Sequence, residues 1–110
     1  MFYTFCQNNS GGYFIENDEF GICEVIIIEA NTKQDAINYF RTFEEKESNF
    51  NDFCFCCGMR WNFDEMDLEE YSYPSIFNIK IENIKKDWLR ERCFVHNCYN
   101  KTFYEYRFKD

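Results

Sequence analysis

The residues with the clearest capacity for chemistry are seven cysteines and a single histidine. Cys54 and Cys57 form a C-x-x-C pair followed by a glycine, a spacing at which two thiolates can bind one tetrahedral zinc ion. Cys93 and His96 would supply the second half of such a site, and Cys98 competes with Cys93 for the fourth position. On a strand, however, Cys93 and His96 would point to opposite faces. Two interpretations therefore stay open, a zinc site or a set of small buried thiols.

A second candidate site is a polar loop that follows the first predicted strand. Its amide and hydroxyl side chains and its backbone N–H groups are suited to a small polar ligand or an anion. An arginine and a tryptophan further along the chain would add a charge and a stacking face. The alternative interpretation is a simple hairpin turn. The candidate ligand-binding residues are Gln7, Asn8, Asn9, Ser10, Arg60 and Trp61.

A third feature is an acidic run over residues 64–70, where five carboxylates lie among large apolar side chains. Carboxylates at this density repel one another and resist burial. With aromatic anchors beside them, they predict a surface that binds a basic partner. The predicted partner-binding residues are Asp64, Glu65, Asp67, Glu69, Glu70, Trp61 and Tyr71.

The overall charge excludes one class of partner. The formal net charge is −8, whereas a protein that binds a nucleic-acid backbone is expected to be basic. The charge is unevenly spread, because residues 1–75 carry 15 acidic and 4 basic side chains and residues 76–110 carry 5 and 8. The four glycines form no phosphate-binding loop, and no nucleophile turn accompanies the histidine. We therefore expect a binding protein and not an enzyme.

The elements that would position these residues form a single domain over residues 1–110. Strong β-branched or alternating patterns predict strands, and Thr32 is placed to begin a helix as its N-cap, with Asp35 three residues later. The pattern predicts an α+β fold, a mostly antiparallel sheet with one main helix packed on one face. The expected strands cover residues 2–7, 22–29, 77–81, 93–98 and 102–108, and the expected helix covers residues 32–45.

No segment predicts membrane association. The longest apolar run, Val25 to Ile28, is far shorter than a membrane span. Residues 1–7 have neither the basic start nor the apolar stretch of a signal peptide. We therefore expect a soluble intracellular protein, in which the thiols are reduced or bound to metal.

Several motifs together resemble a family of small bacteriophage proteins to which no chemistry is assigned. They are Gln-Asn-Asn-Ser-Gly-Gly (7–12), Ile-Ile-Glu-Ala-Asn (27–31), Cys-x-Cys-Cys-Gly-x-Arg-Trp (54–61) and Val-His (95–96). The resemblance implies a phage accessory protein that acts in the host cytoplasm. Combined with the acidic run, it predicts inhibition of a host defence or nucleic-acid-processing protein with a basic surface, in an anti-CRISPR-like or DNA-mimic role. The alternatives are sequestration of a nucleotide signal, and a zinc-stabilised structural or replication accessory.

Overall fold

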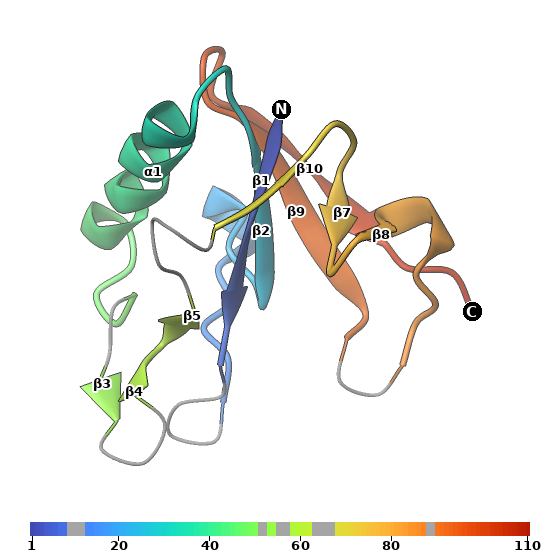
Figure 1. Ribbon diagram of the computed structural model, residues 1–110. Helices are drawn as coiled ribbons and strands as arrows, with labels where there is room; N and C mark the ends of the chain where they lie inside the picture. Colours follow the sequence, from blue (N-terminus) through green and yellow to red (C-terminus); the bar gives the residue numbers. More distant parts are fainter. Residues whose placement is uncertain (9–12, 51–52, 55–57, 63–67, 88–89) are drawn as a thin grey trace.

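The computed structural model describes residues 1–8, 13–50, 53–54, 58–62, 68–87 and 90–110, with the backbone alone at 53–54, 58–59 and 62. Its centre is a six-stranded sheet of order β10-β9-β2-β1-β5, in which β6 also pairs with β1 (Figure 1). All pairs are antiparallel except β2 with β9. The bounds are β1 Phe2–Gln7, β2 Val25–Glu29, β5 Trp61–Asn62, β6 Glu69–Tyr71, β9 Arg92–Asn97 and β10 Thr102–Arg107.

The central position of β2 follows from its sequence. Its four residues from Val25 to Ile28 are β-branched and completely buried, which requires cover on both faces of the sheet. β1 and β9 flank β2, so apolar side chains above and below the sheet form two separate clusters.

The helix α1 (Lys33–Arg41) covers the first face of the sheet (Figure 1). Thr32 is its N-cap, because the Thr32 hydroxyl oxygen accepts a hydrogen bond of 3.1 Å from the Asp35 N–H. The helix continues as the 3-10 turn η3 (Thr42–Glu45), so the predicted extent of 32–45 is confirmed as two consecutive elements. Phe40 stacks on Phe5 of β1 with the ring centroids 4.1 Å apart, which attaches the helix to the sheet.

The opposite face of the sheet is covered by a hairpin and a 3-10 turn (Figure 1). The Thr4 hydroxyl of β1 donates a hydrogen bond of 2.6 Å to the Ser75 carbonyl and fixes the hairpin to the sheet. The α+β fold with one α-helix in the described residues and a mostly antiparallel sheet is thus confirmed. The smaller elements are η2 Asp18–Phe20, β3 Phe53–Cys54, β4 Gly58–Met59, β7 Ser75–Ile76, β8 Ile79–Lys80 and η4 Ile81–Asn83.

The prediction of a half-buried strand over 77–81 is wrong. Phe77 and Asn78 have positive φ angles of 50° and 69° and form the turn between β7 and β8. Phe77 and Ile79 are exposed as a result, and only Ile81 of the alternating set is buried. Apolar and polar residues can alternate in the same way along one strand and along two short strands joined by a tight turn. The alternation alone therefore does not distinguish a strand from a hairpin.

In the described part of the chain, no helix is long and apolar enough to cross a membrane.

Candidate functional site

His96 belongs to the core and not to an open metal site. Its Nε2 lies 2.8 Å from the Gly21 carbonyl oxygen, and its Nδ1 lies 3.0 Å from the Tyr39 hydroxyl oxygen. Since a carbonyl oxygen only accepts, Nε2 carries the proton and Nδ1 accepts from Tyr39. Burial lowers the pKa of His96 to about 4, so the ring is neutral at neutral pH. Both nitrogens are occupied, which leaves no lone pair for a metal ion.

The structure does not bring the predicted metal ligands together. Cys93 lies in the cluster on the face of the sheet opposite His96, as the alternation along β9 requires. Cys98 packs at the margin of the helix-side cluster. The side chain of Cys54 and all of Cys57 lie outside the described residues. Among the residues that the structure describes, no group of three or more His, Cys, Asp or Glu side chains is placed to hold a metal ion.

Thiol reactivity is expected to follow burial. Burial raises the pKa values of Cys6 and Cys23 to about 12 and raises that of Cys93 as well, so these thiols stay protonated. Burial raises the pKa of Cys98 too, but this thiol is only half-buried, so reagents reach it more easily. Alkylation of the folded protein, followed by peptide mapping, should modify Cys98 at least about tenfold faster than Cys6, Cys23 and Cys93. The four rates should converge in urea, and equal rates in the folded protein would contradict this packing.

The predicted ligand loop is held by buried polar groups. The Gln7 amide donates to the carbonyls of Ile15 and Cys23, at 2.9 and 2.8 Å, and accepts from the Ile15 N–H. The Arg60 guanidinium is buried, donates to the Tyr13 carbonyl at 3.0 Å and lies over the Tyr13 ring. These bonds satisfy backbone groups inside the protein, which is a structural role.

The remaining members of that site divide into three groups. Trp61 is buried, and its Nε1–H donates a hydrogen bond of 2.9 Å to the Phe50 carbonyl. Asn8 is half-buried, and its backbone N–H donates to the Arg60 carbonyl. Asn9 and Ser10 lie outside the described residues. Because Trp61 is in the core, its ring is not available for stacking on a ligand or for anchoring a partner.

The acidic run is described only at its end. Asp64, Glu65 and Asp67 lie outside the described residues, and Glu70 is exposed on β6. Glu69 has internal partners, because its carboxylate accepts from the Tyr71 hydroxyl and from the Phe77 N–H. Glu69 and Tyr71 therefore hold the β7–β8 hairpin, and of the described carboxylates in this run only Glu70 faces solvent.

A second acidic surface is formed by residues 16–20 and 42–47, which tertiary structure brings together. Asn17 Nδ2 donates to Glu47 Oε2 at 3.3 Å, and the Lys46 ammonium lies 5.5 Å from the centroid of the Phe20 ring. We call this the acidic surface. Its carboxylates are Glu16, Asp18, Glu19, Glu44, Glu45 and Glu47, and Lys46 is the only basic residue in the two segments.

Arg92 of β9 organises one side of the acidic surface. Its guanidinium lies 2.8 Å from Asp18, 3.3 Å from Glu16 and 2.6 Å from Glu105 of β10. These bonds lower the pKa values of Asp18 and Glu105. The carboxylates of Asp18 and Glu105 therefore stay charged in mildly acidic solution.

An aromatic hollow of about 240 Å³ adjoins the acidic surface. Phe20 and Lys46 belong to both, so the hollow and the carboxylates form one continuous region. Phe103 on its wall is about one-third exposed and lies against the buried His96 ring. The hollow is lined by Phe20, Tyr39, Thr42, Lys46, Lys101 and Phe103. It offers apolar area beside charge, as hot-spot regions of protein interfaces do.

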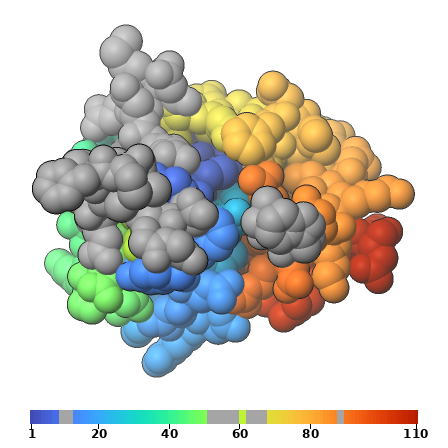
Figure 2. Space-filling model, turned by 90° about the horizontal axis from the view of Figure 1, so that it is seen from below, coloured from blue at the N-terminus to red at the C-terminus, as the bar shows by residue number. Residues whose placement is uncertain are grey.

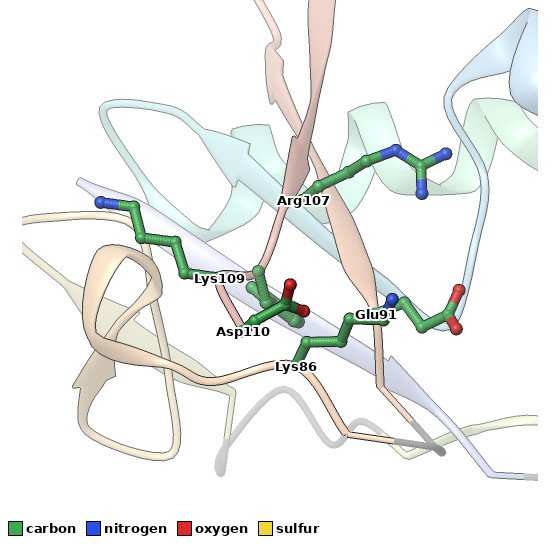
Figure 3. Close-up of a pocket in the computed structure, with 6 residues that line it drawn as sticks. Lys86, Glu91, Arg107, Lys109 and Asp110 are labelled. Atoms are coloured by element: carbon green, nitrogen blue, oxygen red, sulfur yellow. The ribbon is translucent and has the colours of Figure 1, made fainter.

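A second hollow, of about 350 Å³, lies at the C-terminal end of β10 (Figure 3). The Lys86 N–H donates to the Lys109 carbonyl at 2.7 Å, so the segment before β9 and the C-terminal residues lie side by side, as Figure 2 also shows in orange and red. Figure 3 shows the side chains of Arg107 and Lys109 pointing in opposite directions. Cations that diverge cannot close around one small anion, so this hollow is not a compact anion site.

Comparison with protein families gives the affiliation of the chain. A family model described as a domain of unknown function, DUF7296, matches residues 1–107. The chain belongs to the DUF7296 family. Comparisons with curated proteins and with solved structures find no match.

The acidic surface of this DUF7296 chain was absent from the sequence-based candidates, although its signal was present. Three of the four residues 16–19 and three of the four residues 44–47 are acidic. Each group taken alone is typical of a solvated turn or helix end. Only the Asn17–Glu47 hydrogen bond and the Lys46–Phe20 contact show that the two groups share one surface.

Proposed function

We propose that this protein is a phage accessory protein that binds and inhibits a host protein with a basic surface. It works by occupying that surface and not by catalysis, and it acts in the host cytoplasm. The target is a defence or nucleic-acid-processing protein, in the manner of an anti-CRISPR or a DNA mimic.

The observation that carries this proposal is the acidic surface beside the aromatic hollow. Six carboxylates lie in the two segments that adjoin the hollow, and the hollow presents the rings of Phe20, Tyr39 and Phe103. Aromatic side chains supply most of the affinity at protein interfaces, and charged rims supply the association rate and the selectivity. Three cations, Lys46, Lys101 and Arg92, lie in or against this region, so its six carboxylates leave it with a negative charge.

The chemistry of the target follows from this charge. Proteins that bind nucleic acid use Lys and Arg to neutralise closely spaced phosphates. A dense group of carboxylates on a folded protein presents the same sign of charge to those side chains. The proposed target is therefore a protein that also binds DNA or RNA, and the two ligands should compete.

Competition is the direct test. The tagged protein is immobilised and incubated with a lysate of the host bacterium, and retained proteins are eluted with duplex DNA at low salt and then with increasing salt. We expect a nucleic-acid-binding protein to be released by DNA and by salt, because charge pairs at an interface rim are screened. The immobilised protein itself should retain no DNA. Partners that neither DNA nor salt displaces would contradict the proposal.

A further inference from the structure

Strand β10 is an edge strand whose outer side can be assigned residue by residue. The Phe108 N–H donates to the Glu91 carbonyl on the side of β9. Since backbone groups alternate between the two sides of a strand, those of Phe103, Glu105 and Arg107 point away from the sheet. Lys109 fits this alternation, because its carbonyl accepts the Lys86 N–H on the outer side. The outer edge from 103 to 107 ends the strand order of the main sheet.

The side chains of β10 are mostly exposed, and cations flank the strand at both of its ends. Glu105, the only carboxylate of β10, already holds Arg92 at 2.6 Å and Arg107 at 3.1 Å. The diverging side chains of Arg107 and Lys109 spread positive charge along the end of the strand (Figure 3). The cations near the edge are Lys85, Lys86, Lys101, Arg107 and Lys109, and the carboxylates beside them at the C-terminal end are Glu91 and Asp110.

We propose that β10 accepts an extended acidic segment of a partner protein by antiparallel strand addition. The outward N–H and C=O groups of Phe103, Glu105 and Arg107 would provide the backbone hydrogen bonds. Distributed cations match carboxylates repeated along a strand better than they match one small anion. The exposed rings of Tyr104 and Phe103 add apolar contact on the two faces.

A second copy of the chain fits this edge less well. In an antiparallel pair of two β10 strands, one register forms the backbone hydrogen bonds of all three outward residues. That register places Glu105 opposite Glu105 of the other copy and Phe103 opposite Arg107. It also brings Lys101 of each copy toward Lys109 of the other. Like charges directly opposite each other are destabilising, so charge favours an acidic segment over self-association.

This inference goes beyond the proposed function. Lys101 and Phe103 contribute to the hollow as well as to this edge, but no carboxylate of the acidic surface lies on the β10 edge. The test uses NMR on the labelled full chain with the blocked peptide Glu-Val-Glu-Val-Glu. We expect amide exchange at Phe103, Glu105 and Arg107 to slow by about tenfold or more at saturation, while Tyr104 and Tyr106 are already protected. The matched peptide Lys-Val-Lys-Val-Lys should cause no protection.

Two variants separate charge from backbone pairing. Arg107→Ala removes one cation and keeps the backbone N–H of residue 107. Arg107→Pro removes the cation and the backbone N–H, at an edge position where proline is tolerated. Arg107→Pro should bind the acidic peptide several-fold more weakly than Arg107→Ala, about threefold to tenfold for one hydrogen bond. If Arg107→Pro does not fold, a peptide that is N-methylated at alternate residues replaces it and should lose binding to the natural chain.

Four results would overturn the inference. The first is that the acidic peptide does not bind, and the second is that the lysine peptide binds equally well. The third is that the acidic peptide binds without protecting the three outward amides. The fourth is that these amides are protected in the free protein and that the protection increases with protein concentration. The last result would assign the edge to a second copy of the chain.

Discussion

Replacing Gly21 by alanine is expected to lower the free energy of unfolding by about 3 kcal/mol. Gly21 has a φ of +69°, and an added Cβ would lie 2.7 Å from Phe103 Cδ2 and 2.8 Å from His96 Cε1 and Nε2. The left-handed backbone costs an L-residue about 1 kcal/mol, and overpacking adds about 1–3 kcal/mol. A shift that relieves the contact would also stretch the hydrogen bond from His96 to the Gly21 carbonyl.

A substitution at a second position separates the cost of backbone strain from the cost of overpacking. Asn78 has the same φ of 69° but is exposed, so Asn78→Ala should cost only the backbone strain, about 1 kcal/mol. Both variants are measured by urea denaturation, in which the midpoint reports the change when the slope is unchanged. Equal losses at the two positions would show that Gly21 is not in close contact with His96 and Phe103.

Acidification is expected to destabilise the protein through His96 before Asp18 and Glu105 titrate, because the pKa values of these two carboxylates are lowered. The pKa of His96 is about 4 in the folded protein and near 6.5 in the unfolded chain, so the unfolded chain binds the proton more tightly. The His96 contribution is fully present above pH 6.5, falls as the pH drops and levels off below about 4. Its total size is about 3 kcal/mol, because the ring is almost completely buried.

The matched variant for this prediction is His96→Gln, which can donate to the Gly21 carbonyl but does not titrate. Its unfolding free energy should be lower at neutral pH and should not fall between about pH 6.5 and 4.5, because the pKa of Glu24, which burial raises, acts in the opposite direction. The pKa values of Asp18 and Glu105 are lowered in the fold, so their stabilisation is lost only at more acidic pH. The same pH slope in the natural chain and the variant would contradict a neutral, buried His96.

The sequence predicted the elements whose signals are local. The β-branched run from Val25 to Ile28 identified the central strand, and Thr32 identified the start of the helix. The alternation along β9 also predicted that Cys93 and His96 face opposite sides of the sheet. These features depend on spacing alone, and spacing is visible in the sequence.

The candidate sites were less predictable because their chemistry depends on distant partners. Gln7 and Arg60 have polar side chains typical of a ligand site, yet they satisfy backbone groups of Ile15, Cys23 and Tyr13. Trp61 appeared to be an exposed anchor but fills the core beside Phe50. The acidic surface depends on a contact between Asn17 and Glu47, which are 30 residues apart, and no local pattern shows such a contact.

The central claim is that the acidic surface binds the partner, and charge reversal tests it most directly. In Glu19→Lys/Glu45→Lys two exposed carboxylates of that surface are reversed, and in Glu82→Lys/Glu91→Lys two exposed carboxylates of the C-terminal part. Both variants change the net charge equally, so a difference between them reports position alone. Retention of the DNA-displaceable partner should fall about tenfold or more for the first variant and stay unchanged for the second. Equal retention by the two variants, whether lowered or unchanged, would contradict the account.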